Sequence, residues 1–315
     1  MSSSSNLPAA DGSGSVSQAP SPTAIVGREP GLKDAYAEVN GIRLHYVEQG
    51  EGPLVVLLHG FPEFWYSWSK QIDALANAGF RVVAPDMRGY NLSDKPPGVK
   101  AYDTDPLAAD IAGLIRERGE ERAFLAGHDW GATVAWAMAM DHPEVVERLA
   151  ILNGAHPRKL QKALHSKPRQ LIRSWYFFAF QTPWLPERIE TLDRHRSLRN
   201  RFKDAKPGAF TKEDIDRYVD AWSQPGALTG QLNYYRAAVR VSSKVAEARI
   251  KPLQAPTRVI WGEKDRYLGR DLAEPDPADV PNLEQVIRLP DASHWVLQDE
   301  PGRVSELLRE FFTRS

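Results

Sequence analysis

The sequence Gly127-His128-Asp129-Trp130-Gly131 decides the fold of this chain. It follows an apolar run at 123–126 that is typical of a buried strand, and it precedes an alanine-rich run at 132–140 with high helical propensity. A strand that turns sharply into a helix between two glycines has the pattern of a nucleophile elbow, because glycine leaves room where a Cβ would clash. The residue at the tip is Asp129 instead of the usual serine. An aspartate, with a reference pKa of about 3.9, is ionised at neutral pH and can attack a saturated carbon without a base.

Strand and helix patterns alternate on both sides of this motif. Two runs at 36–39 and 42–47, joined by Asn40-Gly41, predict an antiparallel hairpin. Parallel strands are indicated at 54–58, 80–84, 149–152, 257–261 and 284–287, and helices at 68–78, 107–118 and 303–312. The alternation predicts a mostly parallel, twisted sheet flanked by helices.

The segment at 155–240 interrupts this alternation. It has aromatic and basic residues at helical spacing, broken by prolines, and no strand pattern. We expect an inserted helical cap there, between core segments at 35–154 and 241–315. The aromatic residues at 175–184 indicate either an apolar pocket lining or core packing. Residues 1–34 are rich in Ser, Gly, Pro and Ala, a composition that predicts a disordered tail.

The composition of the 315-residue chain excludes several classes of function. Forty Lys and Arg against 41 Asp and Glu give a net charge of −1, so nothing indicates nucleic-acid binding. The chain has no cysteine, which excludes disulfides and thiolate chemistry. No apolar run approaches the roughly 18 residues that span a membrane, and no signal peptide is recognisable. We expect a cytoplasmic protein with a small substrate and without a metal or organic cofactor.

Two other strand ends supply partners for Asp129. An ester formed on this aspartate must be hydrolysed, which requires a base and a group that orients the base. Asp265 follows the predicted strand at 257–261, and His294 follows the one at 284–287. The order of nucleophile, acid and histidine is that of the α/β-hydrolase fold. Other carboxylates near Asp265 that leave its assignment open are Glu263, Asp271 and Asp276.

The loop His59-Gly60-Phe61-Pro62 directly follows the predicted strand at 54–58. Its backbone N–H groups and that of Trp130 are placed to meet the negative charge that develops when water attacks an ester, as an oxyanion hole does. The alternative is an ordinary turn at a strand end. We interpret His59 and His128, which lie beside these residues, as packed, hydrogen-bonded histidines.

The stretches HGFPEFWYSW at 59–68 and GHDWG at 127–131 resemble the paired signatures of the α/β-hydrolase-fold epoxide hydrolases. The resemblance extends from about residue 37 to residue 312. It implies that Asp129 is the nucleophile, His294 the base and Asp265 its orienting acid. It further implies an oxyanion hole formed by the N–H groups of Phe61 and Trp130, and a cis peptide bond before Pro62.

The same resemblance implies two cap tyrosines that hydrogen-bond the epoxide oxygen. Tyr235 in the stretch NYYR and Tyr176 in the stretch WYFF stand at the matching places, although Phe177 replaces a glutamine of the mammalian enzyme. Ring opening leaves an alkoxide, which departs poorly unless a donor protonates it. Cap aromatics are otherwise most often packing residues.

The predicted function is hydrolysis of a small apolar epoxide by water to a vicinal diol, through an ester on Asp129. The main alternative is a haloalkane or haloacid dehalogenase, which uses the same nucleophile but binds its leaving halide with indole or amide N–H groups. Trp175 is a candidate for such a donor. A serine esterase is disfavoured because no Gly-x-Ser-x-Gly follows a strand. A non-catalytic binding protein would be expected to lack one of the three catalytic candidates.

Overall fold

The computed structural model describes residues 31–314. Residues 1–30 of the tail that we expect at 1–34 therefore lie outside the described residues. The first strand begins at Lys33, so the two residues before Ala35 belong to the sheet.

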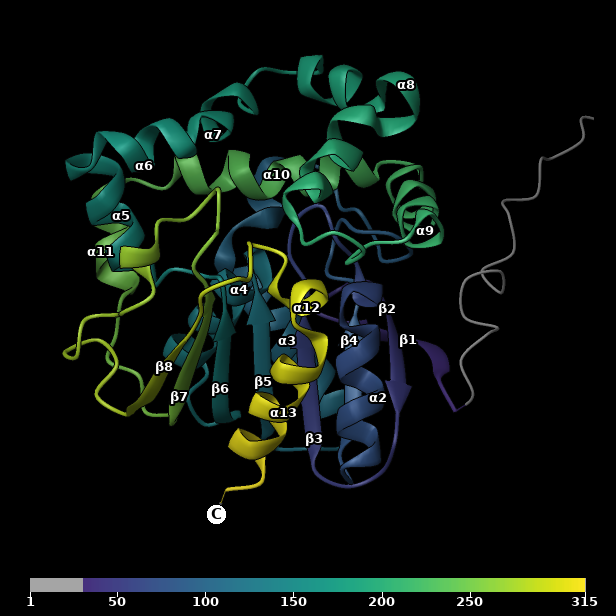
Figure 1. Cartoon of the computed structure of the whole chain (residues 1–315), viewed down its shortest axis with the longest axis vertical. Helices are drawn as coiled ribbons and strands as arrows, with labels where there is room; N and C mark the ends of the chain where they lie inside the picture. The colour runs from purple at the N-terminus through teal and green to yellow at the C-terminus, as the bar shows by residue number, and fades with distance from the viewer. Residues whose placement is uncertain (1–30, 315) are drawn as a thin grey trace, which may run out of the picture.

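An eight-stranded sheet forms the centre of the molecule (Figure 1). Its strand order is β1-β2-β4-β3-β5-β6-β7-β8; β1 and β2 form the antiparallel hairpin, β2 pairs antiparallel with β4, and the strands from β4 onward run parallel. The strands are β1 (Lys33–Val39), β2 (Ile42–Gln49), β3 (Leu54–Leu58), β4 (Arg81–Pro85), β5 (Ala123–His128), β6 (Val146–Leu152), β7 (Thr257–Gly262) and β8 (Leu283–Leu289). All five residues of β3 are buried, as a strand covered on both faces requires.

Helices cover both faces of this sheet (Figure 1). Helices α2 and α13 pack together on one face, and α3 and α4 pack together on the other. The core helices are α2 (Ser69–Asn77), α3 (Thr104–Glu117), α4 (Trp130–Asp141), α12 (Val296–Asp299) and α13 (Pro301–Phe312), and the single-turn helices are η1 (Trp65–Trp68), η2 (Val99–Tyr102), η3 (Phe202–Asp204) and η4 (Arg270–Leu272). In α13 the buried Val304, Leu307, Leu308 and Phe311 recur at helical spacing, which gives this helix one apolar face.

A helical layer lies over the carboxyl ends of the strands, between β6 and β7 in the chain (Figure 1). It consists of α5 (Pro157–Ser166), α6 (Pro168–Arg173), α7 (Trp175–Ala179), α8 (Leu185–Arg201), α9 (Lys212–Trp222) and α10 (Ala227–Arg240). Helix α11 (Ser243–Arg249) follows this layer in the chain and contacts α5. Pro186 stands in the first turn of α8, where proline is compatible with a helix. The hydroxyl of Tyr234 donates to the Arg88 carbonyl oxygen at 2.9 Å, and the Trp222 indole donates to the Pro62 carbonyl oxygen. These hydrogen bonds join the helical layer to the loops of the sheet.

The register of the sheet aligns the strand ends that carry the candidate residues. Leu58 of β3 pairs with Gly127 of β5, and His128 of β5 pairs with Leu152 of β6. Leu152 in turn pairs with Ile260 of β7. Residues that directly follow these strands therefore meet at one edge of the sheet, beneath the helical layer.

None of the helices within residues 31–314 combines the length and the apolar character needed to cross a membrane.

Candidate active site

The elbow between β5 and α4 holds Asp129 in a strained conformation. Its φ of 52° and ψ of −117° are unusual for a residue with a side chain. The neighbouring glycines allow the turn, because a Cβ on Gly127 would lie 2.4 Å from the Gly131 carbonyl oxygen, and one on Gly131 would lie 2.1 Å from the Leu58 carbonyl oxygen. The strand, the sharp turn and the helix thus fix the position of the Asp129 carboxylate.

The two oxygens of Asp129 have different neighbours. Oδ1 accepts a hydrogen bond of 2.7 Å from the Phe61 backbone N–H, and Oδ2 lies 3.4 Å from Nε2 of His294. Burial raises the pKa of Asp129, but the hydrogen bond and charge of His294, the nearby His128 and the Phe61 N–H together lower it below the ordinary value. Asp129 is therefore a carboxylate, as nucleophilic attack requires.

His294 is held by Asp265. Its Nδ1 lies 2.7 Å from Oδ2 of Asp265, while its Nε2 faces Asp129. Burial lowers the pKa of His294, but Asp265 and Asp129 together raise it to about 10. Burial likewise opposes ionisation of Asp265, whose pKa is nevertheless lowered by His294 and by its other hydrogen bonds. Before any reaction the site contains an imidazolium between two carboxylates.

Four N–H groups hold the Asp265 carboxylate. Oδ1 accepts from the backbone of Tyr267 at 2.7 Å and of Leu268 at 2.9 Å, and Oδ2 accepts from Nδ2 of Asn153 at 2.7 Å as well as from His294. The competing carboxylates are engaged elsewhere. Asp271 pairs with Lys167, Glu263 with Arg288, and Asp276 accepts from the backbone N–H of Ala278. Among the nearby carboxylates that the sequence offers, Asp265 is the one in contact with His294.

The sequence did not indicate two buried residues that orient this site. Asn153, which directly follows the strand predicted at 149–152, donates to Asp265 and accepts a 2.8 Å hydrogen bond from the Gly262 N–H. Glu63 lies 2.8 Å from Nδ1 of His128, whose Nε2 lies 2.9 Å from the His294 carbonyl oxygen. The only local sequence feature that could have indicated a role for Glu63 in the site is its position directly after the loop at 59–62.

His59 and His128 are packed and hydrogen-bonded, as expected. Nδ1 of His59 lies 3.0 Å from the Gly60 carbonyl oxygen, and its Nε2 accepts from the Met87 N–H at 3.0 Å. His128 uses both ring nitrogens. Neither ring has a nitrogen free to take a proton from water.

The expected oxyanion groups lie on two sides of Asp129. The Phe61 N–H already donates to its carboxylate, and the peptide bond between Phe61 and Pro62 is cis, as expected. Trp130 is the first residue of α4, and its N–H makes no hydrogen bond within residues 31–314. This N–H is one of the unpaired donors at a helix N-terminus, which favour negative charge.

Tyr176 of α7 and Tyr235 of α10 lie close together above the elbow. Their ring centroids are 5.6 Å apart, and the Tyr235 ring also contacts Phe61 and Trp130, with centroid distances of 5.2 and 5.0 Å. Burial, followed by the charge of Asp129, raises both tyrosine pKa values well above 10. Neither hydroxyl makes a hydrogen bond within the described part of the chain, so both are protonated donors available to a ligand.

A cavity of about 800 Å³ opens between α6, α7 and α8. Its inner wall contains Tyr176 and Tyr267, and the ring of Tyr267 lies 5.0 Å from that of His294. Trp175, the donor expected for a dehalogenase, is 66% exposed at the cavity rim. The cavity therefore leads from the surface of the helical layer toward the tyrosines.

Comparisons with known proteins agree with this geometry. The family model described as alpha/beta hydrolase fold matches residues 53–301. A Bacillus subtilis protein named AB hydrolase superfamily protein YfhM is 44% identical over 89% of this chain and 98% of its own length. Epoxide hydrolase 3 of Xenopus tropicalis is 39% identical over 86% of this chain and 75% of its own length. This chain belongs to the epoxide hydrolases of the α/β-hydrolase fold. The fold and the family predicted from the sequence are thereby confirmed.

A solved structure of an epoxide hydrolase extends this agreement to three dimensions. The Bacillus megaterium epoxide hydrolase, determined in complex with an inhibitor, is similar with a TM-score of 0.80 and 33% identity. The match covers 89% of this chain and all of that one, so the helical layer is included. Within residues 31–314 of this epoxide hydrolase, no group of three His, Asp or Glu side chains is suited to hold a metal ion.

Proposed function

We propose that this epoxide hydrolase converts a small apolar epoxide and water into a vicinal diol in two steps. The observation that carries the proposal is the alignment of Asp265, His294, Asp129 and the Phe61 N–H, with atoms 2.7, 3.4 and 2.7 Å apart in that order. We further propose that residues 155–240 act as the cap that closes this site, inserted between core segments 35–154 and 241–315.

In the first step, a carboxylate oxygen of Asp129 attacks an epoxide carbon and forms an ester. The carbon–oxygen bond of the ring breaks, and its electron pair leaves on the oxygen. Tyr176 and Tyr235 hydrogen-bond this oxygen and provide the proton that converts it to a hydroxyl. Their high pKa values keep both phenols protonated until the alkoxide, a stronger base, develops.

In the second step, His294 removes a proton from water, and the resulting hydroxide attacks the ester carbonyl. The N–H groups of Phe61 and Trp130 hold the oxyanion of the tetrahedral intermediate. Collapse of this intermediate breaks the ester bond, and the departing diol oxygen takes the proton that His294 removed from water. The carboxyl proton of Asp129 then passes to His294, which restores the carboxylate and the imidazolium. Esterification removes the negative charge of Asp129, one of the two carboxylates that raise the pKa of His294. The first step leaves one tyrosine as a phenolate, and the imidazolium proton of His294 returns to it once the charge of Asp129 is lost. His294 therefore becomes a neutral base only after the ester has formed.

Isotope labelling tests the covalent intermediate. A single turnover of an epoxide such as styrene oxide in oxygen-18 water should place the label in the Asp129 carboxylate, detected by mass spectrometry of its peptide. The peptide with Asp265 serves as the internal control and should stay unlabelled. Label in the diol with an unlabelled Asp129 would mean that water attacks the epoxide directly. Faster release of halide from a haloalkane than turnover of the epoxide would instead favour a dehalogenase.

A further inference from the structure

Large apolar side chains are concentrated on the outside of the helical layer. Ten are exposed among residues 31–314, and eight of them lie between positions 171 and 192. We call these eight the cap patch, which consists of Leu171, Ile172, Trp175, Phe178, Trp184, Leu185, Ile189 and Leu192. Their exposed fractions range from 40% to 72%. Single exposed apolar residues are ordinary, but a cluster of this kind marks an interaction surface.

The amphipathic pattern of α8 is turned outward. Leu185 and Ile189, four positions apart, are exposed, and so is Leu192, where the backbone of α8 leaves the helical conformation at 192–195. Glu190, in contrast, is only 3% exposed and pairs with Arg201 at 2.9 Å. Glu187 also turns toward the protein and pairs with Arg236 at 2.7 Å. A helix that served only to cover the core would place its apolar stripe inward and its charges outward. This half of α8 does the reverse.

Positive charge surrounds the cap patch. Residues 167–203 contain nine Lys or Arg and three Asp or Glu, whereas the whole chain has a net charge of −1. Two of the three acidic residues are turned inward, as described above, and so is Arg201, the partner of Glu190. Arg169 and Arg188 are exposed and form no ion pair within residues 31–314. The outward surface of α6, α7 and α8 is therefore both apolar and cationic.

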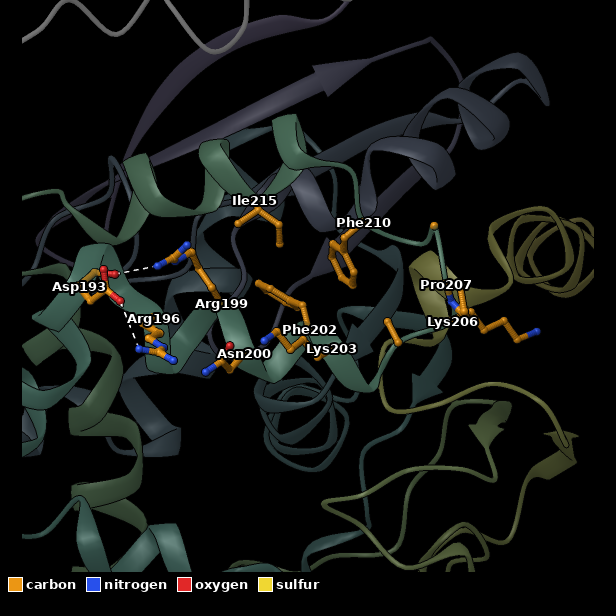
Figure 2. A pocket seen from close by; sticks show the side chains of 12 residues that line it. Asp193, Arg196, Arg199, Asn200, Phe202, Lys203, Lys206, Pro207, Phe210 and Ile215 are labelled. Carbon is orange, nitrogen blue, oxygen red and sulfur yellow. Dashed lines mark hydrogen bonds and ion pairs between the residues drawn. The ribbon is translucent and has the colours of Figure 1, made fainter.

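The second half of α8 adds basic side chains to this surface. Figure 2 shows Arg196 and Arg199 beside Asp193, at one end of a cavity of about 560 Å³ whose other end contains Lys206 and Pro207. The ion pair of Arg196 with Asp193 spans 3.6 Å between side chains that are both largely exposed. Asp193 is thus a single exposed acidic residue next to the basic side chains of Arg196 and Arg199.

The cap patch also surrounds the entrance to the site. Four of its members, Ile172, Trp175, Leu185 and Ile189, line the 800 Å³ cavity whose inner wall contains Tyr176. Helices α6, α7 and α8 form the outermost layer of the molecule, with α10 between them and the sheet (Figure 1). A flat partner could therefore contact the patch without meeting the core.

We propose that the cap patch docks on an anionic lipid bilayer, with the entrance of the cavity facing the membrane. Exposed Trp, Phe and Leu side chains with arginines around them match the boundary between acyl chains and negatively charged headgroups. The chain would lie on the surface and not span the membrane. Apolar epoxides dissolved in the bilayer would then reach the cavity without crossing water. Docking itself does not depend on the proposed function.

Vesicle flotation of the full chain tests this proposal. Wild-type protein should float with vesicles of phosphatidylcholine containing about 30 mol% phosphatidylserine at least roughly fivefold more than with phosphatidylcholine alone. Raising the salt from about 0.1 M to 1 M should weaken the binding, because salt screens the arginines. No flotation with either vesicle would refute docking.

Substitutions outside the cavity lining separate docking from catalysis. Trp184→Asp, Phe178→Asp and Leu192→Asp should each reduce the floated fraction severalfold, and Arg188→Glu should reduce it about tenfold on anionic vesicles. Val245→Asp, at an exposed apolar residue outside the patch, is the matched control and should float as wild type does. All variants should retain wild-type turnover of a water-soluble epoxide, a measurement that tests the proposed function separately.

Two results would overturn the inference. The first is equal flotation of wild type and Trp184→Asp, which would place the membrane contact elsewhere. The second is a wild-type dimer, seen by analytical ultracentrifugation, that Trp184→Asp converts to a monomer while neither protein floats. The patch would then be the interface between two copies of this chain.

Discussion

Removal of the negative charge of Asp129 should convert His294 from a cation into a neutral base. The pKa of His294 is raised to about 10, against its burial, by Asp265 at 2.7 Å and Asp129 at 3.4 Å. The substitution Asp129→Asn imitates the loss of charge that accompanies ester formation and leaves Asp265 in place. The pKa of His294 should therefore fall in this variant.

The size of the effect follows from the distance. Two unit charges 3.4 Å apart attract each other by about 5 kcal/mol at an effective dielectric constant of about 20. Each 1.36 kcal/mol corresponds to a factor of ten in a protonation equilibrium. Loss of this attraction is therefore large enough to make the neutral form of His294 accessible near neutral pH.

Nuclear magnetic resonance of histidine-labelled protein measures this pKa directly. In the wild type, His294 should stay protonated until about pH 10, and in Asp129→Asn it should titrate at clearly lower pH. Asp271→Asn removes an exposed carboxylate that pairs with Lys167 and should leave His294 unchanged. An identical titration of His294 in the wild type and Asp129→Asn would refute the idea that ester formation creates the base.

The same shift predicts how stability depends on pH. A raised pKa means that the folded state binds the proton more tightly than the unfolded state, where the pKa of histidine is about 6.5. The stabilisation by His294 is thus fully present below about pH 6.5 and is lost as the pH rises to about 10. Asp129→Asn should lose less stability over this range than the wild type, as urea unfolding at several pH values would show.

Three further predictions concern the acid, the tyrosines and a buried histidine. Asp265→Asn should slow ester hydrolysis roughly 10²–10⁴-fold in rapid-quench experiments, because all four partners of this carboxylate are N–H donors and an amide NH₂ would face two of them. Tyr235→Phe and Tyr176→Phe should each slow ring opening about tenfold or more in single turnovers, without a matching loss in ester hydrolysis. The carboxylates of Asp86 and Asp34 raise the pKa of His45 to about 9 despite its burial. His45 therefore stabilises the fold below about pH 6.5, and this stabilisation is lost as the pH rises to about 9. The substitution His45→Gln should flatten this pH dependence of stability, measured by thermal unfolding.

Local patterns were sufficient to predict the elbow and the sheet. The two glycines around Asp129 and the apolar runs before and after it report on backbone conformation within a few residues, which short-range sterics determine. Asp265 and His294 were predicted to lie near Asp129 because each comes within a few residues after a strand, and the carboxyl ends of parallel strands meet at one edge of the sheet.

Contacts between distant segments were not predictable in this way. The hydrogen bond from Asn153 to Asp265 joins residues 112 positions apart, and that between Glu63 and His128 joins residues 65 apart. Neither pair has a local pattern of its own. The aromatic residues at 175–184 illustrate a second limit, because helical spacing defines a stripe without showing which way it faces. Tyr176 lines the cavity, whereas Phe178 and Trp184 face outward.

The replacement of serine by Asp129 changes what the histidine must do at each step. A serine nucleophile has to lose its proton before it attacks, so its histidine must be neutral at the start. Asp129 carries its negative charge already, and an imidazolium 3.4 Å away stabilises it without preventing attack. Ester formation then neutralises Asp129 and leaves His294 with Asp265 as its single carboxylate partner. On this argument the nucleophile itself controls when the base becomes active, and a neutral substitute at position 129 should separate the two roles of His294.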